Sequence, residues 1–129
     1  MKAWQEFEEE ILKIFEEHGF KSKRRFIFKD EIGRGEIDIL AERFGIILAV
    51  DAKRYTESWY RLSALKKEAK KHADRCKRLE KVIGRRIIPV IVSLIDDHVY
   101  FHHSFIVPFV ALNDFLLNLH YYLTEFGFE

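Results

Sequence analysis

The first residues of the chain repeat apolar side chains at helical spacing. Between Lys2 and His18 the apolar positions recur three and four residues apart, at Trp4, Phe7, Ile11, Ile14 and Phe15. This spacing places them on one face of a helix, and Gly19 follows as a stop signal. The pattern predicts an amphipathic helix over residues 2–18.

The period then changes to that of β-strands. Three strand-like runs follow, at Arg24–Lys29, Glu36–Ala41 and Ile46–Lys53. Gly45 lies in a short turn between the second and third runs. These two runs are therefore predicted to form a β-hairpin.

The second half of the chain begins with a long helical pattern from Ser58 to Val82 that is rich in Lys, Arg, Glu and Ala. Arg86–Leu94 is a nearly unbroken apolar run, as expected of a strand buried on both faces. Another strand is predicted at Val99–His103, and a helical apolar repeat occupies Ala111–Leu123. The predicted order is α-β-β-β-α-β-β-α, which indicates an α/β fold with helices on the faces of a mixed sheet.

Composition supports one compact unit. The 129 residues are 48% hydrophobic and 33% charged, which suits a single domain over residues 1–129. The N-terminus is acidic, unlike a signal peptide, and no apolar run reaches the about 20 residues that span a bilayer. These features predict a cytoplasmic protein with no membrane partner.

Cys76 is the only cysteine, so no intramolecular disulfide or cysteine-rich metal site is possible within the chain. Its basic neighbours would lower the pKa of an exposed thiol. A half-buried structural thiol is the favoured interpretation.

Two carboxylates and a lysine on the predicted hairpin form a candidate site. Because side chains alternate along a strand, Asp51 and Lys53 share a face. A hairpin centred on Phe44-Gly45 places Asp38 opposite Asp51, with β-carbons roughly 5 Å apart. Facing carboxylates repel, and a divalent cation such as Mg²⁺ or Mn²⁺ removes the conflict. Spacing alone leaves open a surface hairpin whose charges are solvated or ion-paired.

This set of groups has the chemistry that phosphodiester hydrolysis needs. A divalent cation polarises a phosphoryl oxygen and generates a nucleophile at neutral pH. The ammonium of Lys53 stabilises charge that develops on the phosphate. With Asp38 and Asp51 as metal ligands, these are the parts that phosphodiester hydrolysis needs.

The two segments Gly35–Ala41 and Val50–Tyr55 resemble the motif of the PD-(D/E)XK nuclease superfamily. Within it, the pattern is most similar to Mrr-like restriction endonucleases and archaeal Holliday-junction resolvases, and the similarity spans residues 3–95. The resemblance implies a restriction-endonuclease-like fold and a Mg²⁺-dependent endonuclease that cuts DNA. Asp51 stands where the family's E-X-K variant has Glu, and Ile37 stands where many members have Pro. Neither difference removes a functional group.

The resemblance also implies an acid on the first helix. Phe7-Glu8, followed by Gly19-Phe20, is similar to the Mrr-like helix and makes Glu8 a catalytic residue and metal ligand, acting directly or through water. Glu8 lies on the apolar stripe of the predicted helix, where a buried acid needs a partner. Glu6 is the weaker rival. An acid at the stripe's edge near the positive helix terminus is the alternative.

Charge is distributed unevenly along the chain. Thirteen basic and four acidic residues lie between Lys53 and Arg86, whereas the first 18 residues hold two basic and six acidic ones. The basic stretch predicts contacts to a phosphate backbone, with recognition of backbone or shape rather than base edges. Candidate nucleic-acid-binding residues are Arg54, Tyr55, Lys66 and Lys70. The alternative is a solvated helix face.

Other polar pairs have simpler interpretations. His102 and His103 are adjacent on a predicted strand, so their rings should face opposite sides and not chelate one ion. Asp96-Asp97 is interpreted as a turn. The apolar tail helix is a candidate homodimer interface and equally a cover for the sheet.

The leading hypothesis is a Mg²⁺-dependent endodeoxyribonuclease of restriction, repair or junction-processing type. A nucleic-acid-binding module that kept the fold but lost activity is the main alternative. An RNA-processing nuclease is the third, because restriction-like domains also occur in RNA-processing enzymes.

Overall fold

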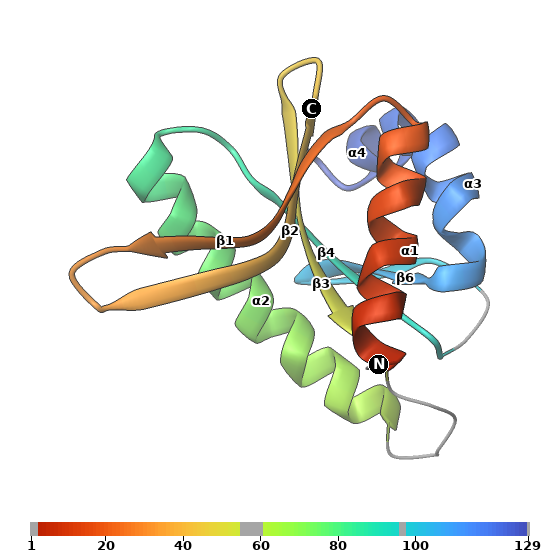
Figure 1. Cartoon of the computed structure of the whole chain (residues 1–129), viewed down its shortest axis with the longest axis horizontal. Coiled ribbons are helices and arrows are strands. Elements are labelled where there is room, and N and C mark those ends of the chain that lie inside the picture. Colours follow the sequence, from red (N-terminus) through yellow and green to blue (C-terminus); the bar gives the residue numbers. More distant parts are fainter. Residues whose placement is uncertain (1–2, 55–60, 96–97, 129) are drawn as a thin grey trace.

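The computed structural model describes residues 3–54, 61–95 and 98–128. Figure 1 shows a twisted sheet with helices packed around it. The predicted α/β class, a mixed sheet flanked by helices, is confirmed. Within the described ranges, no helix combines the length and apolarity needed to cross a membrane.

A helix, three strands, a second helix and a fourth strand follow one another up to Ser93. In full, the elements are α1 (Ala3–Glu17), β1 (Lys21–Lys29), β2 (Arg34–Arg43), β3 (Ile46–Lys53), α2 (Arg61–Ile83), β4 (Ile88–Ser93), β5 (Tyr100–His102), β6 (Ser104–Pro108), η1 (Phe109–Ala111), α3 (Leu112–Leu117) and α4 (Leu119–Glu125). The sheet order is β1-β2-β3-β4-β6-β5. Strands β1 to β3 are antiparallel neighbours, β3, β4 and β6 run parallel, and β5 is antiparallel to β6.

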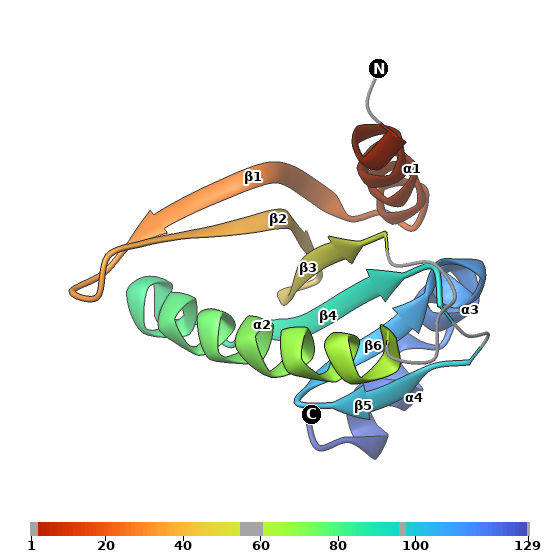
Figure 2. The ribbon, with the colours of Figure 1, turned by 90° about the horizontal axis from the view of Figure 1, so that it is seen from below.

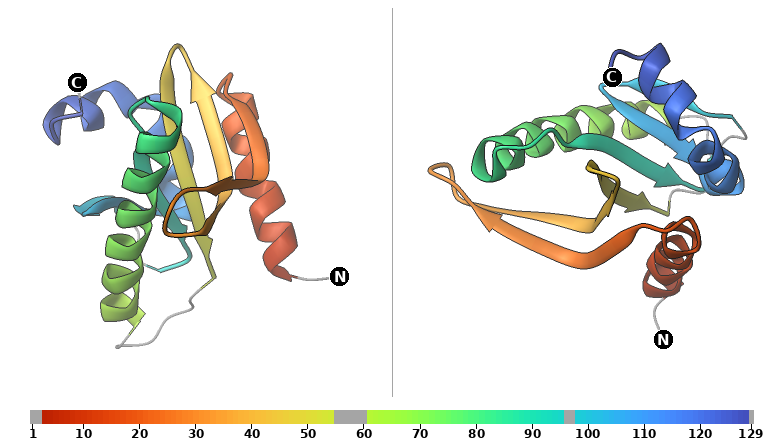
Figure 3. Two further views of the ribbon diagram at one scale, coloured as in Figure 1. Left: turned by 90° about the vertical axis from the view of Figure 1, so that its left-hand side faces the viewer. Right: turned by 90° about the horizontal axis from the view of Figure 1, so that it is seen from above.

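The sheet separates two layers of helices. On one face, Phe7, Ile11 and Phe15 of α1 join residues of α3 and α4 in one large apolar cluster. On the other face, α2 packs against the sheet in two smaller clusters. Figure 3 shows α2 and α1 on opposite sides of the central strands. The tail helices therefore serve as a cover for the sheet, which is one of the two roles that the sequence left open.

The sequence-based order is wrong in omitting a strand. Ser104–Pro108 forms β6, is buried along its whole length and lies between β4 and β5. The predicted strand through His103 instead ends at His102, and His103 makes the turn with a φ of 63°. Turns of this kind usually carry Gly, Asn or Asp, and none of these residues stands at position 103. The sequence therefore carried no sign of a turn at His103.

The predicted single tail helix over Ala111–Leu123 is also wrong. Asn118 has non-helical angles and separates α3 from α4. Its side-chain amide donates to the backbone carbonyl of Asp114 at 2.9 Å. Apolar side chains continue at helical spacing on both sides of this break, which is why the periodicity did not reveal it.

The other boundaries differ less. β1 begins at Lys21, earlier than the predicted Arg24, because it continues to pair with β2 as far as Glu42. β3 has the predicted bounds. The predicted helix start at Ser58 and the predicted turn at Asp96-Asp97 lie outside the described residues.

Candidate active site

The β2–β3 hairpin positions the candidate site. Its turn has positive φ at both central residues, 52° at Phe44 and 80° at Gly45. Positive angles at both positions are typical of the two-residue turns whose twist matches that of the flanking strands. The strands pair from Arg43 opposite Ile46 to Ile39 opposite Val50. The predicted hairpin and its register are confirmed.

The two strands separate directly beyond the last of these pairs. Asp38 is the next residue of β2, and its Oδ2 accepts a hydrogen bond from the backbone N–H of Ala52 at 3.0 Å. Figure 2 shows the β1–β2 hairpin extending away from β3 from this region. The carboxyl of Asp38 thus accepts a hydrogen bond from the backbone of β3 where the pairing of β2 with β3 ends. This bond fixes the position of the carboxyl between the two strands.

The structure brings the two predicted carboxylates together. Burial, followed by a hydrogen bond with Asp51 and charge repulsion from it, raises the pKa of Asp38 to about 6, against smaller opposing effects of the Ala52 N–H and Lys53. Asp51 itself is only 8% exposed. Two carboxyl groups in contact and out of water therefore resist being charged at the same time.

Lys53 extends from the same face of β3. Its Nζ lies 3.3 Å from Asp51 Oδ2 and 3.4 Å from Glu68 Oε1. Burial by itself lowers the pKa of Lys53, but the two carboxylates outweigh burial and the net shift is upward. Lys53 therefore remains a cation at neutral pH and is held between two anions.

Glu68 is a site residue that the sequence analysis missed. It comes from α2, and its Oε2 also lies 3.7 Å from Lys71 Nζ. A helical wheel offered a signal, because Glu68 lies three residues after Leu65 and four before His72, both of which are buried. In the sequence, Glu68 counted only as one of the four acidic residues in the basic stretch.

His72 was also missed. It is fully buried on α2, and its Nε2–H donates to the backbone carbonyl of Ala49 on β3 at 2.8 Å. Its Nδ1 lies 3.4 Å from Arg75 Nη1 and accepts from it. Burial lowers the pKa of His72 to about 4, so the ring is neutral and ties α2 to β3.

Cys76 lies one helical turn beyond His72. The thiol is 1% exposed, and burial raises its pKa to about 12. The predicted structural role is confirmed, with fuller burial than expected. The basic neighbours do not activate it.

The structure does not bring Glu8 together with the carboxylate pair. Glu8 is 5% exposed, and its Oε1 lies 2.9 Å from Arg24 Nη2 and 3.8 Å from Arg25 Nη2. Over the ranges that the structure describes, no group of three or more His, Cys, Asp or Glu side chains is arranged to hold a metal ion. Two arginines thus satisfy the buried acid for which the sequence suggested a metal.

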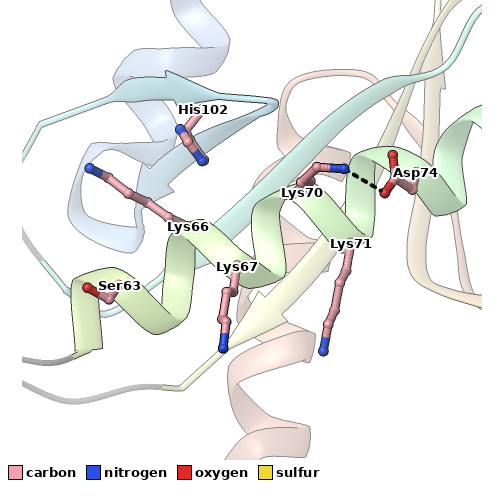
Figure 4. A pocket seen from close by; sticks show the side chains of 7 residues that line it. All are labelled: Ser63, Lys66, Lys67, Lys70, Lys71, Asp74 and His102. Carbon is pink, nitrogen blue, oxygen red and sulfur yellow. Dashed lines mark hydrogen bonds and ion pairs between the residues drawn. The ribbon is translucent and has the colours of Figure 1, made fainter.

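The predicted nucleic-acid-binding residues are exposed where they can be placed. Lys66 and Lys70 line a hollow on α2, and Lys70 pairs with Asp74 at 3.2 Å (Figure 4). Arg54 is exposed at the end of β3. Tyr55 lies outside the described residues.

The prediction that His102 and His103 face opposite sides is wrong. Their ring centroids lie 4.7 Å apart and the rings are perpendicular. The left-handed turn at His103 removes it from the strand alternation on which the prediction depended.

Asp38 and Asp51 are the residues suited to hold a divalent cation. Each contributes carboxylate oxygens, the donors that Mg²⁺ and Mn²⁺ prefer. The pKa of Asp38 is raised first by burial and then by Asp51, and a cation between the two carboxylates would relieve their repulsion. The donor set therefore fits such an ion, with two acidic ligands rather than the three expected.

These features define a mixed α/β protein with a carboxylate pair and a half-buried lysine on one face of its sheet. The chain belongs to the same family as an uncharacterized protein of Archaeoglobus fulgidus, to which it is 58% identical over 126 residues, 97% of this chain and 98% of that protein.

A solved structure is also similar. AF1548, a protein of unknown function, superposes with a TM-score of 0.53 and is 27% identical, over 67% of this chain and 44% of its own. The match thus spans less than half the length of that protein. No protein-family model matches the chain.

Proposed function

We propose that this protein is a Mg²⁺-dependent endonuclease that hydrolyses DNA phosphodiester bonds, with Mn²⁺ as a possible substitute. The observation that carries the proposal is the contact between Asp38 and Asp51, with Lys53 Nζ 3.3 Å from Asp51. Two carboxyl groups and a lysine ammonium group in contact, where β2 and β3 separate, lower the stability of the fold and are suited to phosphoryl transfer. The PD-(D/E)XK-like motif supports the same chemistry.

Each side chain of the site has a role in this proposal. Asp38 and Asp51 hold the cation, which supplies Lewis-acid polarisation of the scissile phosphate. Lys53 keeps its proton and donates hydrogen bonds to a non-bridging phosphate oxygen, where negative charge grows in the transition state. Glu68 positions the Lys53 ammonium from α2.

The wider setting follows from the same proposal. A restriction-endonuclease-like fold, action on DNA in restriction, repair or junction processing, and a location in the cytoplasm are parts of it. Cutting both strands of a duplex needs two sites, which a homodimer would supply.

A nucleic-acid-binding module without activity is the second candidate. The observation that favours it is the ion pair between Glu8 and Arg24, at 2.9 Å. Glu8 was the third acid expected at the metal site, and it binds an arginine instead. Such a protein would retain the exposed lysines of α2 and bind nucleic acid without cutting it.

A cleavage assay with Mg²⁺ or Mn²⁺ separates these candidates. The substrates are plasmid, single-stranded DNA, a flap, a four-way junction and RNA. Asp51→Ala and Lys53→Ala should each lower cutting by at least about 100-fold while leaving binding largely intact. Glu16→Ala and Lys13→Ala, at exposed positions on α1, are matched controls that should cut like wild type.

Each alternative outcome has a clear meaning. If Asp51→Ala and Lys53→Ala cut as fast as wild type, the site is misassigned. If DNA is bound but no substrate is cut, the protein is a binding module. If RNA alone is cut, the substrate assignment is wrong while the chemistry stands.

A further inference from the structure

A hollow of about 480 Å³ lies on the outer surface of α2. Its lining residues are Ser63, Lys66, Lys67, Lys70, Lys71, Asp74 and, from β5, His102. Four lysines and one aspartate therefore line this space. Figure 4 shows Lys67 and Lys71 extending together to one side of α2, and Lys66 on the side of His102.

The charge of this hollow is poorly compensated. Lys70 pairs with Asp74 and Lys71 with Glu68, but both lysine side chains are well exposed, at 59% and 67%. Exposed pairs of this kind are weak and exchange readily for another anion. Lys66 and Lys67 make no ion pair with any residue in the described ranges.

His102 lines the hollow beside Lys66. The pKa of His102 is lowered, first by burial and then by the charges of His103 and Lys66. A cationic imidazole is therefore disfavoured beside the lysines. The hollow as a whole is suited to an anion with several negative groups, because one small anion cannot reach four separated ammonium groups.

Glu68 connects the hollow to the candidate active site. One of its oxygens lies 3.4 Å from Lys53 Nζ and the other 3.7 Å from Lys71 Nζ. The single carboxylate of Glu68 thus bridges Lys53 and Lys71 through two ion pairs. An extended anion that places one group at Lys53 can continue directly onto Lys71 and Lys67.

The spacing of the lysines matches a polymer of phosphates. Residues four apart on a helix are separated by about 6 Å along its axis. Phosphates of one strand follow one another at about 3.4 Å of axis per nucleotide. Lys67 and Lys71 therefore have the separation of phosphates about two nucleotides apart.

We propose that Lys67 and Lys71, together with the rest of this hollow, bind the phosphodiester backbone of the substrate strand on one side of the scissile phosphate. This inference deepens the proposed nuclease function and rests on it for the identity of the ligand. Lys66 and Lys70 extend the same surface towards β5.

The test measures binding without cleavage. A fluorescein-labelled single-stranded DNA 20-mer is titrated in EDTA at several salt concentrations, with fluorescence anisotropy as the readout. Each lysine–phosphate contact contributes about 0.7 to the slope of log affinity against log salt for single strands. Lys67→Ala/Lys71→Ala should therefore reduce the slope by about 1.4.

The helix itself offers a matched control. Lys77→Ala/Lys81→Ala removes two exposed lysines with the same spacing on the same helix, outside the hollow. It should leave affinity and slope unchanged. An unchanged slope in Lys67→Ala/Lys71→Ala, or an equal loss in the control, would overturn the proposal. Polyglutamate of equal charge that competes as well as DNA would overturn the assignment to a phosphate backbone.

The failures of the two proposals are distinguishable. Asp51→Ala should retain the wild-type slope in the same titration, because that residue lies outside the hollow. If Asp51→Ala abolishes cutting and Lys67→Ala/Lys71→Ala keeps its slope, the nuclease stands and the hollow is not its subsite. If the slope falls as expected but no substrate is cut, the hollow binds nucleic acid and the nuclease proposal fails.

Discussion

The two faces of the sheet are built from different chemistry, and β3 contributes to both. Leu48 and Val50 point into the apolar cluster formed with α1, α3 and α4. The alternate residues point towards α2, where Ala49 is followed by Asp51 and Lys53. A single strand thus supplies a wholly apolar surface on one side and a charged one on the other.

The difference lies in how each face treats buried polar groups. The α1 face is closed by apolar and aromatic side chains, and the buried carboxylate of Glu8 on α1 is paired with the oppositely charged Arg24. On the α2 face, His72 and Ser104 are fully buried, and each bonds a backbone carbonyl, those of Ala49 and Ala69. Asp38 and Asp51 differ from these, because they are partners with the same charge. One face therefore supplies stability, and the other gives up part of it to hold two carboxyl groups together.

The largest expected effect on stability is on the apolar face. Phe15 is fully buried in the cluster, so Phe15→Ala should lower the free energy of unfolding by about 3–5 kcal/mol. Urea denaturation measures the change. Leu117→Ala, at a side chain 67% exposed on α3, should change stability by less than about 0.5 kcal/mol. Equal effects of the two substitutions would show that the cluster is not the main core.

On the α2 face, His72 should make stability sensitive to acid. The pKa of His72 is about 4 in the folded chain, where burial keeps the ring neutral, whereas the unfolded chain protonates it near its ordinary pKa of 6.5. Stability from this group is therefore full above pH 6.5 and is lost as pH falls towards 4. His72→Gln, which can still donate to Ala49, should gain about 2–3 kcal/mol relative to wild type between pH 7.5 and 4. Denaturation curves across this range provide the measurement, and a constant difference between the two proteins would contradict it.

Asp38 should have the opposite dependence. The pKa of Asp38 is about 6 in the folded protein, whereas in the unfolded chain the carboxyl takes up a proton only near its ordinary pKa of 3.8. Wild type therefore gains stability from this group as pH falls from 6 to 4. Asp38→Asn keeps an acceptor for Ala52 and should be about 2 kcal/mol more stable than wild type at pH 7.5 in EDTA. That advantage should disappear at pH 4; a variant less stable than wild type at pH 7.5 would show that the charged pair is not repulsive.

The smallest of these effects concerns metal binding. Because a cation competes with the proton on Asp38, Mg²⁺ affinity should fall about tenfold for each pH unit below 6 and stay level above 7. Calorimetric titration of Mg²⁺, or of Mn²⁺ by electron paramagnetic resonance, measures this without cleavage. Asp38→Asn should bind at least about tenfold more weakly at pH 7.5 and lose the dependence on pH. Binding that does not change between pH 5 and 7 would separate Asp38 from the cation site.

Local patterns made the β2–β3 hairpin predictable. Its alternation and its Gly45 turn lie within a few residues of one another, and they set which side chains are opposite. The carboxylate pair and Lys53 followed from that register. Strand β6 was missed because its turn depends on a left-handed His103, and the tail helix appeared continuous because Asn118 interrupts a regular apolar repeat.

The partners of the charged groups were not predictable in the same way. Glu8 on the apolar stripe was recognised as a buried acid, but its pairing with Arg24 depends on how α1 lies against β1. Glu68 and His72 contact residues of β3 only because of the position at which α2 packs against the sheet. Such contacts join residues 15 to 23 positions apart along the chain.

The sequence by itself determined the α/β class, the hairpin that pairs Asp38 with Asp51 and the concentration of positive charge in α2. Each depends on period, turn residues or composition, which act over short stretches of chain. Tertiary structure alone decided that Arg24 pairs with Glu8 and that Glu68 pairs with Lys53. It also decided that lysines of α2 line one hollow together with His102 of β5. Those outcomes depend on the docking of helices onto the sheet, where burial and charge select among partners that no local pattern specifies.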